Sequence, residues 1–222
     1  QVGDKGVLTW PGGAFEVSDV HFLAHKVIAH AGRVTLGSLA NGIDVSAKVN
    51  RNCRRDTAAN HSATHLLHAA LQEVLGAHVQ QKGSLVDHER LRFDFSHGEA
   101  MSTVQVDEVE GLVNQYVRAN NGVDPRLMDL EEARAEGAAA LFGERYEDEV
   151  RVVSMGEFSL ELCGGTHVHR TGDIGIFRMT SESGIAAGVR RVEALTGEAA
   201  YQHSVNESAT LGRLATVLKT GR

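Results

Sequence analysis

The chain has 222 residues, of which 42% are apolar and 23% are charged, and its formal net charge is −7. This composition is that of a globular protein of one or two domains, and it excludes a collagen-like, low-complexity or wholly disordered chain. No stretch approaches the ~18 consecutive apolar residues that cross a membrane, and no basic-then-apolar targeting segment opens the sequence.

Residues 1–55 are expected to form short β-strands. Apolar runs between residues 7 and 28 are broken by Pro and Gly, and apolar residues alternate with polar ones from Ile43 to Val49. Alternation with a period of two is typical of a half-buried strand. Several short strands with frequent glycine turns predict a small N-terminal β-barrel. Its boundary near residue 55 rests on the change in periodicity.

From Asp56 to Leu75 the chain lacks Gly and Pro, and its leucines recur at helical spacing. This pattern predicts a helix that is capped by Asp56 and stopped by Gly76. The same two periodicities predict the remaining elements. They are a hairpin at 79–86 and 91–95, helices at 102–120 and 131–140, strands at 123–130, 150–155, 158–162, 174–179 and 189–195, and a helical tail. The fold class is therefore α+β, with an α/β core after the barrel.

Two histidines, His61 and His65, lie at i and i+4 on the first predicted helix, where two imidazoles can share one metal ion. About a hundred residues on, Cys163-Gly-Gly-Thr-His167 offers a thiolate and an imidazole, and its glycines let the backbone turn sharply. Together these side chains form a tetrahedral N₃S set that suits Zn²⁺. Either half alone is a weak signal, because such a histidine pair is more often solvent-facing or part of the core, and a small buried cysteine is as common as a ligand. His68 is an alternative ligand, although we expect it to be a neighbour.

The residues around the histidines exclude two classes of zinc enzyme. A zinc protease helix carries Glu directly after the first His as general base, and this chain has Ser62 there. The paired cysteines and adjacent Glu of zinc deaminases are missing as well.

The cysteine count and the charge give two further expectations. With only Cys53 and Cys163 the chain cannot build a disulfide framework, so we expect a cytoplasmic protein. The 12 histidines favour metal or proton chemistry, whereas the net acidic charge alone argues against a nucleic-acid partner. The sequence starts at Gln1 and has no stop signal at Arg222, so we expect a piece of a longer chain.

Four stretches together resemble one family: residues 60–68 (Asn-His-Ser-Ala-Thr-His-Leu-Leu-His), 81–85 with 91–95, 161–167 (Glu-Leu-Cys-Gly-Gly-Thr-His) and 181–194. Their order and spacing are similar to the editing region of alanyl-tRNA synthetase. Free-standing alanyl-tRNA editing proteins and the threonyl-tRNA synthetase editing domain share the metal motif, but the longer match favours alanyl-tRNA synthetase.

The resemblance implies three parts, namely a barrel-like domain (1–55), a zinc-dependent editing core (56–200) and the start of a C-terminal linker helix (201–222). The aminoacylation core, with its ATP site, would lie outside this chain.

The activity that the resemblance implies is hydrolysis of the ester that joins Ser or Gly to the terminal adenosine of tRNA(Ala). An alanine pocket excludes glycine poorly, and an added hydroxyl is a modest discriminator, so a second, hydrolytic site is needed. The resemblance also implies that His61, His65, Cys163 and His167 hold one Zn²⁺. Cys163 is then required for catalysis, and Gln81 contacts the serine hydroxyl. The zinc either lowers the pKa of a bound water toward ~7 or orients the ester while a separate water attacks. A role for Thr64 is not expected.

The expected tRNA contacts are backbone N–H groups near the glycine-rich turn at residues 184–188 and a set of arginines. Arg190 and Arg191 are adjacent on the last predicted strand, so only one of them can face the pocket. For every arginine of the set, the alternative is that it is solvated surface. The candidates are Gly188, Arg190, Arg191, Arg51, Arg54 and Arg55. Asp94 is expected either to support a zinc histidine or to pair across strands.

The expected partner is the acceptor end of tRNA(Ala) carrying Ser or Gly, with no membrane, and the oligomeric state is left open. Two other functions fit the same residues. One is a structural zinc module that binds tRNA without catalysis, because closed zinc sites are commonly structural. The other is a zinc hydrolase of a small ester or amide. A local positive face on a chain of net charge −7 predicts weak tRNA binding with marked salt dependence.

Overall fold

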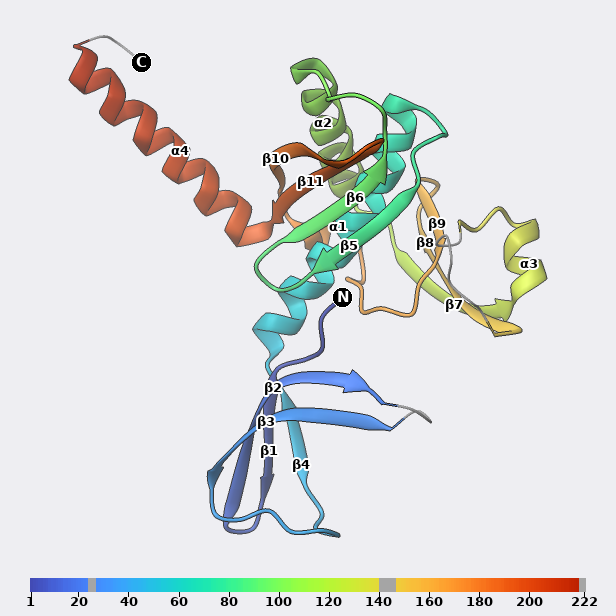
Figure 1. Cartoon of the computed structure of the whole chain (residues 1–222), viewed down its shortest axis with the longest axis vertical. Helices are drawn as coiled ribbons and strands as arrows, with labels where there is room; N and C mark the ends of the chain where they lie inside the picture. Colours follow the sequence, from blue (N-terminus) through green and yellow to red (C-terminus); the bar gives the residue numbers. More distant parts are fainter. Residues whose placement is uncertain (24–26, 140–146, 220–222) are drawn as a thin grey trace.

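The computed structural model describes residues 1–23, 27–139 and 147–219. In this part of the chain the fold is α+β, with three antiparallel sheets and four α-helices (Figure 1). None of the described helices combines the length and the apolar character that a membrane span requires.

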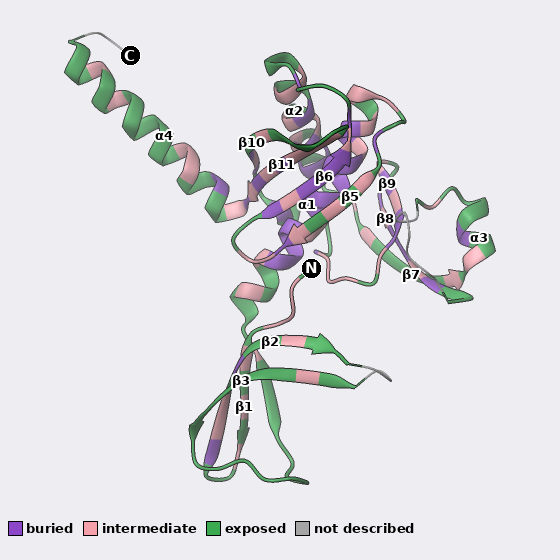
Figure 2. Ribbon diagram, viewed as in Figure 1, coloured by how far each residue is buried: buried purple, intermediate pink, exposed green. Residues whose placement is uncertain are grey.

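The N-terminal strands form one four-stranded sheet in the order β3-β2-β1-β4. Its strands are β1 (Gly6–Trp10), β2 (Gly13–Phe22), β3 (Ile28–Leu36) and β4 (Ser46–Val49). The edge strands β3 and β4 form no ladder with one another in the described residues, so closure into a barrel is not confirmed. The short β4 and the mostly exposed side chains of this sheet give the physical reason, since a closed barrel encloses inward-facing side chains (Figure 2).

The long helix α1 (Arg51–Leu75) leads from this sheet into the core. It begins before Asp56, because the side chain of Asn50 is the N-cap and accepts hydrogen bonds from the N–H groups of Asn52 and Cys53, at 3.1 and 3.2 Å. The predicted cap at Asp56 is therefore wrong: the helix starts in a polar stretch that carries no apolar periodicity. Gly76 ends the helix as predicted.

The core contains a second sheet, in the order β10-β11-β6-β5, against which α1 and α2 pack. Its strands are β5 (Gln81–Val86), β6 (Leu91–Ser96), β10 (Phe177–Ala186) and β11 (Val189–Thr196), and the helix is α2 (Thr103–Ala119). The fully buried Leu66 and Leu67 of α1 and Phe93 and Phe95 of β6 belong to one apolar cluster. The predicted hairpin and second helix are present. The shared apolar cluster holds α1 against the sheet.

A third, smaller sheet in the order β7-β8-β9 carries the segment before Cys163. Its strands are β7 (Val123–Asp129), β8 (Glu149–Met155) and β9 (Ser159–Leu162). Helix α3 (Leu130–Ala135) is shorter than predicted, because the backbone turns at Gly137 with a φ of 85°. The predicted end at Ala140 lies outside the described residues. Helix α4 (Gly197–Leu218) extends away from the core (Figure 1).

Candidate metal centre

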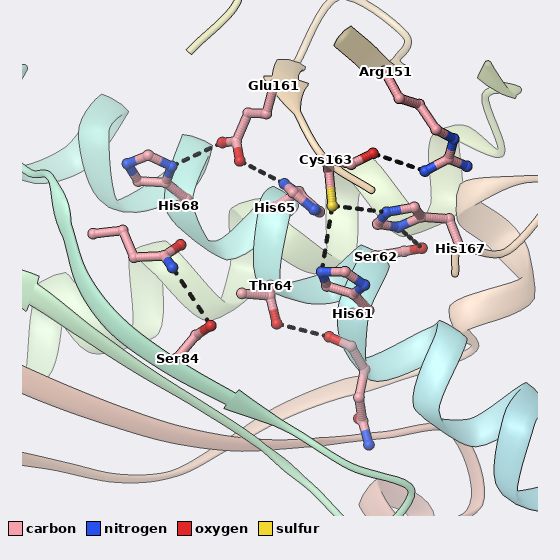
Figure 3. Close-up of polar contacts among 12 residues, drawn as sticks. His61, Ser62, Thr64, His65, His68, Ser84, Arg151, Glu161, Cys163 and His167 are labelled. Carbon is pink, nitrogen blue, oxygen red and sulfur yellow. Dashed lines mark hydrogen bonds and ion pairs between the residues drawn. The ribbon is translucent and has the colours of Figure 1, made fainter. Parts of the chain in front are cut away.

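Four predicted ligands meet where α1 faces the turn that follows β9 (Figure 3). His61 and His65 lie on α1, and Cys163 and His167 lie on the turn. One donor atom from each side chain lies within 4.8 Å of the other three. The Sγ of Cys163 is 3.3 Å from Nε2 of His167 and 3.6 Å from Nε2 of His61. Residues about a hundred positions apart therefore form one compact N₃S cluster.

The remaining ligand atom of the cluster is available for a metal ion. Nε2 of His65 is buried and has no hydrogen-bond partner in the described residues. A buried polar atom without a partner is costly unless something binds it. Three imidazole nitrogens and a thiolate are a set that binds Zn²⁺. The side chains present here therefore fit a zinc ion.

Glu161 supports this cluster through the nitrogen of His65 that faces away from Cys163, a role that the sequence alone does not predict. Nδ1 of His65 donates to Oε2 of Glu161 at 2.5 Å, and Nδ1 of His68 donates to Oε1 at 2.8 Å. A carboxylate on the far nitrogen fixes the tautomer and the orientation of a ligating imidazole. A local signal existed, because residues i and i+2 of an extended segment share a face, which places Glu161 and Cys163 together. His68 is thus a neighbour of the cluster, as expected.

Asp94, the residue predicted as a possible support for a zinc histidine, does not act in this way. It accepts two hydrogen bonds from Arg191 across β6 and β11, at 2.6 and 2.8 Å. The alternative of cross-strand pairing is the one that the structure shows. The carboxylate of Asp94 is paired by the arginine opposite it in the sheet. Glu161 instead lies on the strand that leads into the turn, where it can reach His65.

The other two imidazoles are also held at the nitrogen that faces away from Cys163. Nδ1 of His167 is 3.1 Å from Oγ of Ser62, which also accepts from the N–H of Val168 at 3.2 Å. Nδ1 of His61 donates to Oε1 of Gln1 at 2.9 Å. Ser62 thus occupies the position of a protease's general base but orients a histidine instead. Each histidine of the cluster is oriented before any metal binds.

The two glycines of the turn have different roles from the predicted one. Neither Gly164 nor Gly165 has a positive φ, so the left-handed backbone that favours glycine is not used here. A Cβ added at Gly165 would lie 2.0 Å from Cε1 of His61, whereas one at Gly164 would meet nothing within 4 Å. Gly165 is therefore required for space beside a predicted ligand, and not for sharpness of the turn.

The electrostatics of the cluster favour a thiolate. Burial alone would raise the pKa of Cys163, but the hydrogen bonds with His167 and His61 and the nearby charge of His65 lower it to about 3. Burial would likewise lower the pKa of His65, yet Glu161 and Cys163 raise it to about 10. Burial lowers the pKa of His167 to about 4. At neutral pH the cluster therefore contains a thiolate at Cys163, a neutral His167 and a protonated His65.

Gln81 and Thr64 occupy different environments. Gln81 begins β5, is half-buried, and its Nε2 donates one long hydrogen bond to Oγ of Ser84, at 3.4 Å. Its amide is thus weakly tethered within the described residues. Oγ1 of Thr64 donates to the carbonyl of Asn60 on its own helix, at 2.8 Å. This intrahelical bond uses the hydroxyl proton of Thr64.

Four of the five arginines predicted to contact tRNA are held by a carboxylate, and for Arg51 the described part of the chain shows no such pair. In β11, Arg190 donates to Glu182 at 2.5 and 2.7 Å, and Arg191 binds Asp94. At the start of α1, Arg54 pairs with Asp4, and Arg55 pairs with Asp56 at 2.9 Å. Gly188 lies in the turn between β10 and β11 with a φ of 70°. The two groups of arginines lie on different elements, and their contact with tRNA stays a prediction.

Comparison with known proteins finds that this sequence is similar to tRNA synthetases. Residues 150–193, which include Cys163 and His167, match the family described as the threonyl and alanyl tRNA synthetase second additional domain. The chain is 55% identical over 219 residues to the alanine--tRNA ligase of Nitrosomonas eutropha, and 53% and 55% identical over 219 residues to those of Shewanella loihica and Shewanella amazonensis.

Each match covers 99% of this chain and 25% of the relative, so the chain spans about a quarter of the length of these ligases. The resemblance to alanyl-tRNA synthetase that the sequence predicted is confirmed.

Proposed function

We propose that this chain is the editing part of an alanine--tRNA ligase, and that it hydrolyses the ester of Ser-tRNA(Ala) and Gly-tRNA(Ala). The observation that carries the proposal is the meeting of His61, His65, Cys163 and His167 within 4.8 Å, in a segment similar to alanine--tRNA ligases over 99% of its length. The partner is the acceptor end of tRNA(Ala). The need for such a site is physical, because an alanine pocket discriminates weakly against glycine and serine.

In this proposal the three histidines and Cys163 hold one Zn²⁺. A zinc ion in such a site supplies Lewis acidity, which can polarise a carbonyl or acidify a water molecule. The thiolate of Cys163 needs no deprotonation at neutral pH, since its pKa is about 3. Glu161 fixes His65, and Ser62 fixes His167, so these side chains keep the geometry of the cluster while substrate binds and leaves.

Gln81 is proposed to recognise the serine hydroxyl. Its half-buried amide donates one long hydrogen bond, to Ser84, among the residues that the structure describes, so binding a substrate hydroxyl costs little. The same amide cannot bind glycine or alanine in this way, since neither carries a hydroxyl. Gln81→Ala is therefore expected to slow the release of serine more than the release of glycine.

The direct test is release of labelled serine from Ser-tRNA(Ala) by this chain, with Ala-tRNA(Ala) as the substrate that should stay intact. Cys163→Ala is expected to abolish the release. The matched control is Cys53→Ala, which changes the other cysteine of the chain, half-buried in the first turn of α1. Zinc content is measured on all three proteins by elemental analysis.

The outcomes separate the three candidate functions. A chain that holds one zinc ion and binds tRNA(Ala) but releases no serine would be a structural zinc module. Hydrolysis of small esters that uncharged tRNA(Ala) does not inhibit would indicate a hydrolase of small molecules. Equal serine release by Cys163→Ala and the Cys53→Ala control would refute the role of the cluster.

A further inference from the structure

Arg151 lies on β8, next to the strand that leads into the turn of residues 163–167. Its backbone carbonyl accepts from the N–H of Cys163 at 2.9 Å. Nη1 of its guanidinium donates to the carbonyl oxygen of Cys163 at 2.7 Å (Figure 3). The same nitrogen donates to the carbonyl oxygen of Gly165 at 2.8 Å. One residue thus holds the turn by three hydrogen bonds, two of them at the carbonyls between the predicted ligands Cys163 and His167.

The turn depends on such contacts because it forms neither helix nor strand. It also contains Gly164 and Gly165, and glycine loses more conformational freedom on ordering than any other residue. The other tethers lie toward its far end, where the N–H of Thr166 donates to Gln1 at 2.8 Å and the N–H of Val168 donates to Ser62. The half that carries Cys163 is held from β8.

The charge of Arg151 is directed at this turn. Among the described residues no carboxylate forms an ion pair with it, whereas Arg190 and Arg191 each bind a carboxylate through two nitrogens. The side chain is half-buried, and hydrogen bonds from a charged donor are roughly twice as strong as neutral ones. Both bonds come from Nη1, whose two N–H groups are fixed in the guanidinium plane, whereas the N–H groups of a lysine ammonium rotate and have no fixed orientation.

We infer that Arg151 is a further positioning residue of the metal centre, beside Glu161 and Ser62, and that it holds Cys163 and Gly165 in the metal-binding geometry before an ion arrives. The inference rests on the zinc site of the proposed function. It adds that the affinity of the site for zinc depends on a residue that is not a ligand. Loss of the guanidinium leaves two carbonyls of the turn without their donor, and the ordering of the turn must then come from the ion.

Two measurements on the zinc-free and zinc-loaded chain test the role of Arg151 without tRNA. Zinc affinity is measured by competition with a chromophoric chelator, and hydrogen exchange is measured on peptides that cover residues 163–168. Arg151→Met is expected to weaken zinc binding by about 10- to 100-fold, as for other residues that orient ligands, and to speed exchange in the turn of the zinc-free protein. Arg151→Lys should lie between this variant and the original chain.

The matched control is Arg126→Met on the neighbouring strand β7, where the arginine pairs with Glu136 and lies opposite Val152. Its zinc affinity and its exchange at residues 163–168 should stay unchanged. If Arg151→Met fails to fold, Arg151→Lys alone decides. The inference is overturned if the Arg151 variants keep the zinc affinity and the hydrogen exchange of the unchanged chain, even if serine release is confirmed. Absence of serine release with weakened zinc binding would refute the proposed hydrolysis and leave the role of Arg151 intact.

Discussion

Substitution of the two adjacent glycines of the turn gives a sharp test of the site geometry. At Gly165 an added methyl group would lie 2.0 Å from Cε1 and 2.4 Å from Nδ1 of His61. Ordinary contact begins at 3.4 Å, so the ring must retreat by about 1.4 Å, or the turn must move by as much. Metal–ligand distances tolerate only about 0.2 Å. Gly165→Ala is therefore expected to displace one ligand, which should weaken zinc binding by more than about 100-fold.

Gly164→Ala is the matched control, because it adds the same methyl group one residue earlier. Nothing lies within 4 Å of that position, and its φ is not positive. Zinc affinity from chelator competition should therefore stay within a few-fold of the original value. Serine release from Ser-tRNA(Ala) should follow zinc affinity in both variants.

A double substitution shows whether His61 is the group that is displaced. If the added methyl group acts through His61, then His61→Ala in the Gly165→Ala background should cause little further loss, since coupled effects are not additive. Losses that add in full would mean that the methyl group disturbs something else. The reasoning from the contact distances is refuted if Gly165→Ala binds zinc as well as Gly164→Ala does.

Three further predictions concern the groups around the cluster. Glu161→Gln should weaken zinc binding by about 10- to 100-fold, because an amide offers one acceptor to two imidazoles; unchanged affinity in chelator competition would contradict this. Zinc binding at pH 8 should release about one proton, because Cys163 is already a thiolate while His65, with a pKa of about 10, must lose its proton. The affinity then rises about tenfold per pH unit below that pKa, and calorimetry in buffers of different ionisation enthalpy counts the protons; release of two would show a protonated thiol. Arg191→Ala should lower the Tm in a thermal melt, because it leaves the buried Asp94 without its main partner; an unchanged Tm would refute this.

Local patterns in the sequence are enough to find the four side chains of the cluster, but not the residues that support them. The spacing of His61 and His65 and the turn from Cys163 to His167 are local patterns, and it is the two halves together that indicate metal binding by their residue types. That the two halves meet depends on β9 running against α1, which no local pattern contains. The family resemblance supplied this step, because the order and spacing of four stretches carry tertiary information.

The residues that hold the ligands could not be read from the sequence, since their partners lie far along the chain. Ser62 reaches His167 across 105 positions, and Glu161 reaches His65 across 96. The N-terminal sheet shows the same limit, because alternation predicts strands while closure into a barrel depends on how edge strands meet. The first turn of α1 was missed for a local reason, since its cap, Asn50, precedes polar residues.

The paired arginines change the physical argument about nucleic-acid binding. A phosphate that reaches Arg190 must compete with Glu182, which already accepts two charge-assisted hydrogen bonds from it at 2.5 and 2.7 Å. The binding free energy gained from the phosphate is then only the difference between two interactions of similar strength. On a chain of net charge −7 this favours weak binding of tRNA to the isolated piece, which a titration of tRNA(Ala) at several salt concentrations measures. Tight binding would mean that the carboxylates give way, and Glu182→Gln should then strengthen it further.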